Sequence, residues 1–479
     1  MTYQPPPNGF RTFLVVWCTQ SVSVIGSVLT YFAIIIWLTQ TLYPHPEQQA
    51  RLALAITGLS LTFALPAIFL APLAGAYTDR HDRRRIMMAA DILSGLLSVA
   101  LAALIFTGRL EYWMVLVGGA LSATAGTFHS SAFDASYFML VPEKQLPRAN
   151  GMMQTIWSVS GIVGPALAAA IIALPGLARR GTIGGVLGSA LAGVSSGPGL
   201  AITVDAVTFF LAAAVLLFLQ IPSPKRADLA ATRGGRPAKS IWADVREGAV
   251  YIRRRRPLLW LLGTFAVCNL TLAPIQVVQP LLVKFQLAAD WTARGLSFET
   301  ALALLGSVAS VGGLAGGLVV TAWGGLKRRR VRAVIFPLVL TGVAVAVYGL
   351  STALFLTVAM AFVFAAAGPV MNAHSQTIWQ TQTPAELQGR VFSVRRLIAQ
   401  FTFPIGTAVA GWLAAMVNPA AVVTASGCIL AVFALAQSFN PYLLKVEDKE
   451  GLDRMAAEAG EVPGGAGSTA ASPGASGLA

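Results

Sequence analysis

The sequence has little charge for its length. Asp, Glu, Lys and Arg make up 11% of the 479 residues, against about 25% in an ordinary soluble domain. Hydrophobic residues account for 56% of the chain, and the mean hydropathy is +0.69. A water-soluble globule of this composition would not have enough polar surface to stay dispersed. The composition therefore excludes an ordinary soluble domain and favours lipid as the solvent.

Side chains that bind metals, nucleotides or redox partners are also scarce. Each of the three cysteines, Cys18, Cys268 and Cys428, lies in an apolar segment without metal or redox spacing, so we interpret them as small packing residues. The four histidines are scattered, and we predict no metal site and no cofactor. The sequence has no GxxxxGK[ST] loop, which argues against ATP coupling within this chain.

Apolar runs, by contrast, are abundant, and many reach the roughly 20 residues that a bilayer-spanning helix needs. Helices are the expected form because hydrocarbon offers no other partners for backbone N–H and C=O groups. We therefore predict an all-α membrane protein with twelve transmembrane helices in two pseudo-symmetric six-helix bundles. The predicted spans are 11 to 39, 52 to 77, 86 to 106, 113 to 140, 149 to 174, 200 to 221, 258 to 284, 297 to 323, 333 to 350, 354 to 381, 395 to 416 and 421 to 443.

The cations fall mainly on one side of these spans. With the N-terminus placed in the cytoplasm, 28 of the 34 Lys and Arg residues lie on the cytoplasmic side. Cytoplasmic loops of membrane proteins carry such an excess, so both termini are predicted to be cytoplasmic. The net charge of +14 then reflects topology, and no nucleic-acid partner is predicted. The run IRRRRP at 252 to 257 is interpreted as a topogenic segment that contacts lipid headgroups.

The spacing of the spans predicts four regions. Residues 1–221 form one six-helix bundle, 222–257 a cytoplasmic linker with a short amphipathic helix, 258–443 a second six-helix bundle, and 444–479 a disordered cytoplasmic tail. The Gly-rich outer segment at 175 to 199 is expected to be a flexible insertion. The two bundles also show weak internal similarity, since aligning Pro142 with Pro384 places Arg148 on Arg390.

One loop motif links this layout to a known family. The run GAYTDRHDRRR at 75 to 85 resembles the loop signature of the major facilitator superfamily, in which Gly, three residues and Asp-Arg precede a basic triplet. The longer run APLAGAYTDRHDRRRIMMAAD is similar to the macrolide-efflux branch of that family. The resemblance covers the whole chain apart from the outer insertion and the tail.

This resemblance implies a gate on the cytoplasmic side of the membrane. Asp79 would lie near the N-terminal end of the eleventh span, whose helix dipole is positive there, and Arg83 would pair with Asp134. Such ion pairs would break and reform as the bundles rock. The alternative is that these cations only enforce topology. The predicted gate residues are Gly75, Asp79, Arg80, Arg83, Arg84, Asp134 and Arg390.

A second motif lies in the fifth predicted span, GMMQTIWSVSGIVGPALAA. It resembles the antiporter motif of the same family, although three of the family's glycines are Ser or Ala here. The matching residues are Gly151, Ser160, Gly164, Pro165, Ala168 and Ala169. Within the family the motif accompanies exporters, which favours efflux. Its alternative interpretation is ordinary close packing of helices through small residues.

Ionisable side chains inside the predicted spans are candidates for carrying a proton. Asp205, in AITVDAVTFF, is the first candidate, although a capping or interhelical hydrogen bond would also explain it. Asp91 and Asp134 lie near the cytoplasmic ends of their spans, which equally suits pairing with loop arginines. His129 and His374 titrate in a useful range, but either could be a packing histidine.

Substrate contacts are expected from the first, fourth, seventh and tenth spans, because these line the cavity in the resembled family. A cavity that mixes amides with aromatic and Met side chains would suit a large, mostly apolar molecule. Some of these amides could instead form interhelical hydrogen bonds. The candidates are Gln20, Tyr31, Asn269, Gln276, Gln279, Asn372 and Gln376, with Ser21 and His374 beside them.

Together these features predict a monomeric, proton-coupled exporter of macrolide-like drugs or secondary metabolites in a bacterial inner membrane. Its partners would be the small-molecule substrate, protons and membrane lipids. An exporter of a siderophore or a lipid-like metabolite is the alternative transport hypothesis. A membrane enzyme acting on lipids is disfavoured, because no carboxylate or His cluster has metal or nucleophile spacing.

Overall fold

The protein is described by a computed structural model that covers residues 6–222 and 241–458. These residues form helices and loops, with no β-strand among them, and eleven of the helices are long and apolar enough to cross a membrane. The predicted all-α membrane fold is confirmed. The linker at 223–240 and the tail from 459 lie outside the described residues.

The helices of the first half follow the predicted spans closely. The second span is divided at Leu70 into two helices, and Pro66 and Pro72 flank this break. The helices are α1 Gly9–Trp37, α2 Gln49–Phe69, α3 Ala71–Thr78, α4 Arg83–Phe106, α5 Tyr112–Leu140, α6 Leu146–Arg179, α7 Gly185–Ala192 and α8 Gly197–Phe218.

The second half repeats this layout after the linker. Its eleventh predicted span begins ten residues earlier than expected, at Ala385. The helices are α10 Ile241–Arg254, α11 Arg256–Leu281, α12 Ala288–Ala293, α13 Phe298–Trp323, α14 Arg332–Leu350, α15 Leu354–Gln382, α16 Ala385–Met416, α17 Pro419–Gln437, α18 Pro441–Leu444 and α19 Lys449–Glu458.

The fourth predicted span, 113 to 140, corresponds to α5, which is not among the eleven helices long and apolar enough to cross a membrane. It has the expected length, but Ser122, Thr124, Thr127 and His129 reduce its apolar character. Several residues of α5 face a cavity inside the first half. Because a helix that lines a polar cavity needs less apolar surface than one surrounded by lipid, α5 is compatible with a twelfth span.

Two segments are more ordered than the sequence predicts. The outer insertion at 175–199 contains the last turn of α6 and the helix α7. The tail, expected to be disordered from 444, forms α19, where Leu452 is buried and Asp453 lies 3.3 Å from Arg255. The expectation of disorder was therefore wrong for residues 449–458, because α19 buries an apolar residue against the second half.

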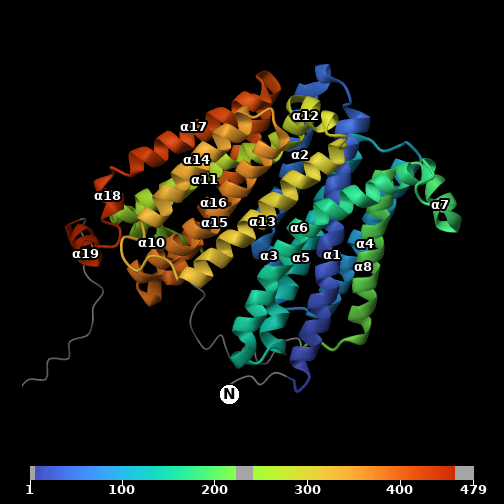
Figure 1. The fold of residues 1–479 in the computed structure, drawn as a ribbon. Coiled ribbons are helices and arrows are strands. Elements are labelled where there is room, and N and C mark those ends of the chain that lie inside the picture. The colour runs from blue at the N-terminus through green and yellow to red at the C-terminus, as the bar shows by residue number, and fades with distance from the viewer. Residues whose placement is uncertain (1–5, 223–240, 459–479) are drawn as a thin grey trace, which may run out of the picture.

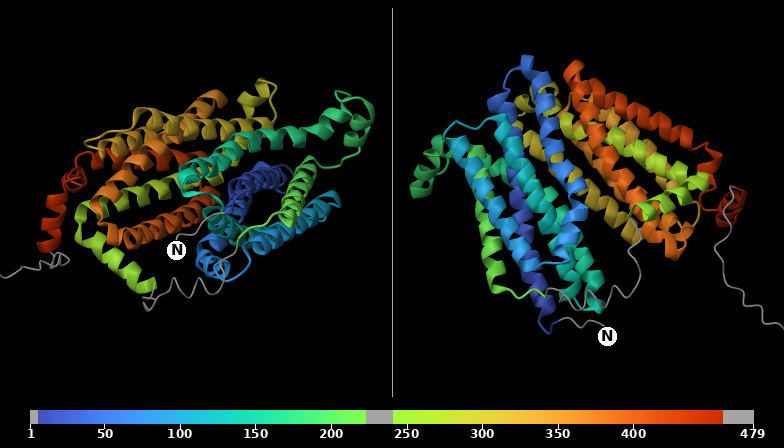
Figure 2. Two further views of the ribbon diagram at one scale, coloured as in Figure 1. Left: turned by 90° about the horizontal axis from the view of Figure 1, so that it is seen from below. Right: turned by 180° about the vertical axis from the view of Figure 1, so that it is seen from behind.

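The two halves lie side by side, with the first half in blue to green and the second in yellow to red (Figure 1). We call the face that holds the start of α1 the N-terminal face and the opposite one the distal face. The halves meet where α6 packs on α13 and α2 packs on α16. They diverge toward the N-terminal face, as both views from the side show (Figures 1 and 2).

Candidate functional site

A cavity of about 530 Å³ lies inside the first half, between α1, α4, α5, α6 and α8. Most of its wall is apolar or aromatic. Six predicted residues line it, namely Gln20, Tyr31, Asp91, His129, Asp134 and Asp205. The structure thus brings four of the five predicted proton candidates to a single cavity, which separate spans in a sequence could not reveal.

Asp91 sits at the meeting point of three helices in this cavity. Its Oδ1 lies 3.5 Å from Nε2 of His129 on α5, and its Oδ2 accepts a hydrogen bond of 3.3 Å from the Gln20 amide on α1. Only 2% of Asp91 is exposed. A buried carboxylate must be paired or hydrogen-bonded to remain charged. Gln20 supplies the hydrogen bond, and His129 supplies a counter-charge when its ring is protonated.

Asp205 on α8 forms a second polar cluster, built from hydroxyl groups. Its Oδ2 accepts hydrogen bonds from Thr30 on α1 (2.6 Å) and Ser98 on α4 (3.0 Å). Its Oδ1 is buried without a hydrogen-bond partner among the described residues. The glycine at 26 makes room for this carboxyl, because a Cβ there would lie 2.6 Å from Oδ1.

The electrostatic character of the cavity is set by carboxylates. Asp91, Asp134 and Asp205 line it together with His129, while no lysine or arginine is among its described lining residues. Asp134 is the exposed member of this set. In a chain with a net charge of +14, the described ionisable residues of this cavity are therefore carboxylic acids and one histidine.

A second cavity of about 520 Å³ lies between the two halves. The predicted residues Gln276 and Gln279 reach it from α11, and Pro165 of the antiporter motif reaches it from α6. Tyr31 and Phe63 line both cavities, and their rings meet edge to face at 5.9 Å. These two aromatic rings, together with Val28, therefore form the shared wall of the cavities.

The resembled antiporter motif lies where α6 crosses α1 and α13. Gly164 faces Val28 of α1 so closely that a Cβ would lie 2.5 Å from a Val28 methyl. Ser160 and Ala168 are buried, whereas Gly151 faces open space. On the side toward the second half, the Ser307 hydroxyl donates to the carbonyl of Ile162 at 2.7 Å.

The predicted gate residues lie on the N-terminal face of both halves. Gly75 is partly exposed, while Asp79 and Arg80 are exposed. Arg84 donates to the carbonyl of Leu219 at 2.9 Å, and Arg390 pairs with Glu247 of α10. Within the described residues, no hydrogen bond or ion pair joins Asp79 to α16, which fits halves that diverge on this face.

Arg83 reaches the segment of α5 that the family resemblance indicates. Its guanidinium donates to the carbonyl of Ala135 at 2.8 Å, directly after Asp134. No ion pair links Arg83 with Asp134 among the described residues. Arg83 thus contacts α5 one residue beyond Asp134, while Asp134 itself lines the cavity.

Four predicted residues lie away from both cavities. Asn269 and Asn372 line neither cavity, and Gln376 accepts a hydrogen bond from Arg395. His374 is buried, with Nδ1 2.7 Å from the carbonyl of Val370 and Nε2 accepting from the Leu326 N–H at 2.8 Å. Both ring nitrogens of His374 are thus engaged by backbone, which favours its packing interpretation.

Sequence reasoning missed several side chains that build the cavity. Thr30 and Ser98 hold Asp205, and Trp157 is an exposed part of the cavity wall. Thr and Ser occur in many helices, where they commonly bond their own backbone. Nothing in the sequence distinguishes the two hydroxyls that point at a carboxylate from those that do not.

Comparison with known proteins agrees with this geometry. The sequence model of the Major Facilitator Superfamily matches residues 16–179 and 181–401. Macrolide efflux protein A of Streptococcus pyogenes is 26% identical over 396 residues, covering 82% of this chain and 87% of that protein. Multidrug efflux pump Tap of Mycolicibacterium fortuitum is 26% identical over 381 residues, covering 76% and 81%.

Solved structures share the fold at low identity. An inward-facing bacterial homologue of the lysosomal transporter Spinster has a TM-score of 0.60 and 14% identity, covering 95% of this chain and 99% of that one. A bacterial homologue of the iron transporter ferroportin, also inward-facing, has a TM-score of 0.58 and 15% identity, covering 90% and 99%. At these identities the likeness concerns the fold alone.

Proposed function

Because the chain belongs to the Major Facilitator Superfamily, we propose that it exports amphipathic drugs or secondary metabolites, macrolide-like compounds among them, in exchange for protons. Family and fold make the chain a multi-pass membrane transporter of small molecules and not an enzyme. The direction of transport, the substrate and the coupling ion are the proposed parts. Relatives named for macrolide and multidrug efflux support the direction and the substrate class.

The observation that carries the proposal is the acidic cavity of the first half. Its apolar and aromatic wall suits an amphipathic molecule, and its three carboxylates without a described lysine or arginine suit a positive charge on that molecule. The same carboxylates can hold protons when no substrate is bound. A cavity with this lining can therefore bind substrate and proton in turn.

Asp205 and the Asp91–His129 pair are the groups we propose for proton coupling. Each carboxylate lies on the cavity wall and is held by side chains from other helices, so its environment depends on how those helices pack. A change in packing between two states of the transporter would change the proton affinity of each group. His374, engaged by backbone on both nitrogens, is less suited to this task.

We propose that the N-terminal face is cytoplasmic and that the protein resides in the inner membrane of a bacterium. The excess of Lys and Arg in the loops on this face supports this orientation. The proposed transport cycle then alternates between the present arrangement, in which the halves meet on the distal face, and one in which they meet on the N-terminal face. Of the proposed gate residues, Asp79 and Arg390 would reach the opposite half only in the second arrangement, whereas Arg83 bonds α5 within the first half.

Uptake into proteoliposomes under an imposed pH gradient tests the function. We expect the parent protein to accumulate a radiolabelled macrolide, and Asp205→Asn and Asp91→Asn to lose gradient-driven accumulation at least tenfold. Asp290→Asn is the matched control, because Asp290 lies outside both cavities on the distal face. If both cavity variants accumulate the macrolide as well as the parent does, the proton assignment is wrong.

A panel of competitors tests the proposed charge preference. Lipophilic cations should compete with the macrolide, whereas anions of the same size and apolar area should not, because the cavity wall has carboxylates and no described cation. Equal competition by cations and anions would contradict the role of the acidic cavity.

A further inference from the structure

Two short π-helical turns occupy corresponding places in the two halves. The turn η1, Leu38–Leu42, follows α1, and η4, Leu282–Gln286, follows α11. Each is closed by the same backbone hydrogen bond of 2.9 Å, from Tyr43 to Leu38 and from Leu287 to Leu282. Since π turns are rare and often occur at functional positions, their presence at two equivalent helix ends calls for a physical reason.

The third residue of each turn reaches across to the other half. Lys284, third in η4, donates its Nζ to the carbonyls of Thr39 and Tyr43 in and beside η1, at 2.7 Å for Tyr43. Gln40, third in η1, donates its Nε2 to Oε1 of Glu299 at 2.7 Å. Glu299 lies in the first turn of α13 in the second half. Equivalent positions therefore each bond the other half, Lys284 to η1 itself and Gln40 to the start of α13.

The acceptors of Lys284 are backbone groups at the C-terminal end of a helix. Such carbonyls lack intrahelical partners and form the negative end of the helix dipole. The ammonium of Lys284 is partly buried there, and no carboxylate lies within ion-pair distance of it among the described residues. Hydrogen bonds to a charged donor are about twice as strong as neutral ones.

We propose that η1 and η4 form a clasp that holds the halves together on the distal face, with Lys284 and Gln40 as the positioning residues that set the balance between the two states of the transporter. This inference rests on the alternating arrangement of the halves in the proposed function. Every bond of the clasp crosses between the halves, so all of them must break when the distal face opens. Loss of Lys284 removes two of the three bonds and therefore favours the state open on the distal face.

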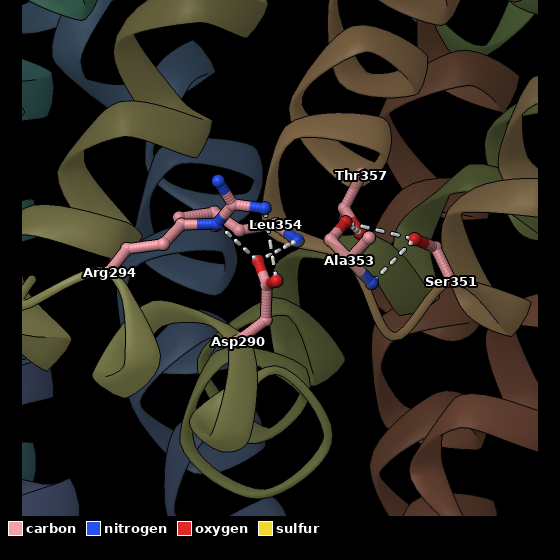
Figure 3. Close-up of polar contacts among 6 residues, drawn as sticks. All are labelled: Asp290, Arg294, Ser351, Ala353, Leu354 and Thr357. Atoms are coloured by element: carbon pink, nitrogen blue, oxygen red, sulfur yellow. Dashed lines mark hydrogen bonds and ion pairs between the residues drawn. The ribbon is translucent and has the colours of Figure 1, made fainter.

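A nearby ion pair on the same face provides the contrast. Asp290 on α12 bonds Arg294 at 3.0 and 3.2 Å and accepts from the N–H of Leu354 at the start of α15 (Figure 3). All three residues belong to the second half. Replacing Arg294 therefore removes one positive charge from the distal face without removing a bond between the halves.

Distances between spin labels measure the equilibrium between the two states of the transporter directly. One label is placed at Arg51→Cys, at the start of α2, and the other at Thr292→Cys on α12, in a chain whose three cysteines are replaced by serine; both positions are exposed on the distal face. Double electron–electron resonance in lipid nanodiscs then gives the ratio of long to short distances. The measurement requires neither substrate nor proton gradient.

We expect Lys284→Met to raise the ratio of long to short distances about tenfold, as the loss of a charged hydrogen bond predicts. Gln40→Ala, at an exposed position, should raise this ratio about threefold because it removes one neutral donor. Arg294→Met should leave it unchanged, and gel filtration confirms that each variant is folded.

Two results would overturn the clasp. One is that Lys284→Met and Gln40→Ala each give the same distance distribution as the parent. The other is a shift in Arg294→Met as large as that in Lys284→Met, which would indicate a general effect of charge on this face. A failure of macrolide uptake with the expected distance shifts would instead contradict the proposed substrate and leave the clasp standing.

Discussion

Two glycines of the resembled antiporter motif should respond to the same substitution in opposite directions. A methyl group at Gly164 would lie 2.5 Å from one methyl of Val28 and 2.9 Å from its Cβ, far inside van der Waals contact. At Gly151, in the same helix, a methyl group would meet nothing within 4 Å. Because alanine has the same helix propensity at both positions, the opposite responses would come from the steric clash at Gly164.

The magnitudes follow from the surroundings of each glycine. Gly164→Ala should destabilise the protein by about 1 to 3 kcal/mol, the usual cost of overpacking a well-filled interface. Gly151→Ala should stabilise α6 by about 0.5 to 1 kcal/mol, because alanine loses less conformational entropy in a helix. Val28→Ala removes the methyl group 2.5 Å away but keeps the Cβ at 2.9 Å, so the double variant should recover only part of the loss.

Thermal unfolding in detergent, followed by light scattering and intrinsic fluorescence, measures the parent and the four variants under one condition. We expect midpoints a few degrees below the parent for Gly164→Ala and slightly above it for Gly151→Ala. The difference between the double variant and Val28→Ala should be smaller than that between Gly164→Ala and the parent. A Gly164→Ala midpoint equal to that of the parent would refute the close approach of α1 and α6. Equal losses at the two glycines would instead indicate that the motif is sensitive to any side chain.

Three further outcomes follow from single contacts. The Arg294 guanidinium and the Leu354 N–H hold the pKa of Asp290 below its ordinary value of 3.8, so the ionised Asp290 stabilises the fold. The midpoint difference between the parent and Asp290→Asn should be present at pH 7, shrink as the pH falls below about 3.8, and disappear once the pH is below the lowered pKa of the folded state; a difference that does not shrink in acid would contradict this. His374→Phe leaves the Leu326 N–H without its acceptor and should cost about 1 to 3 kcal/mol in unfolding assays while the pH profile of uptake keeps its shape; a displaced profile would make His374 a proton carrier. Trp157→Ala removes an exposed aromatic part of the cavity wall and should weaken substrate binding in a fluorescence titration about tenfold without lowering the unfolding midpoint, so unchanged binding would remove this wall from the substrate site.

The positions of the membrane helices and the family could be predicted from the sequence because both depend on residues close together in the chain. A membrane-spanning helix satisfies its own hydrogen bonds, so the apolar runs themselves predicted where α1, α4, α13 and α14 lie. The motif at 75 to 85 indicated the family because its residues are consecutive, so that no tertiary structure is needed to find it. The tail was mispredicted where a distant partner decides the outcome, because Leu452 is buried only through its packing on the second half.

The cavity and the distal clasp required the tertiary structure. Most of these helices are apolar all round, so the pattern of a single helix does not say which side turns toward a neighbour. Asp205 and His374 are alike in sequence as lone polar residues in apolar spans, yet one meets hydroxyls on a cavity wall and the other bonds to backbone. Lys284 is the last residue of the seventh predicted span. Its contact with the end of α1 exists only because two helix ends some 240 residues apart in the chain meet across the halves. The sequence by itself determined which segments enter the membrane, and the packing of those segments against one another determined which polar groups face a cavity, a backbone or the other half.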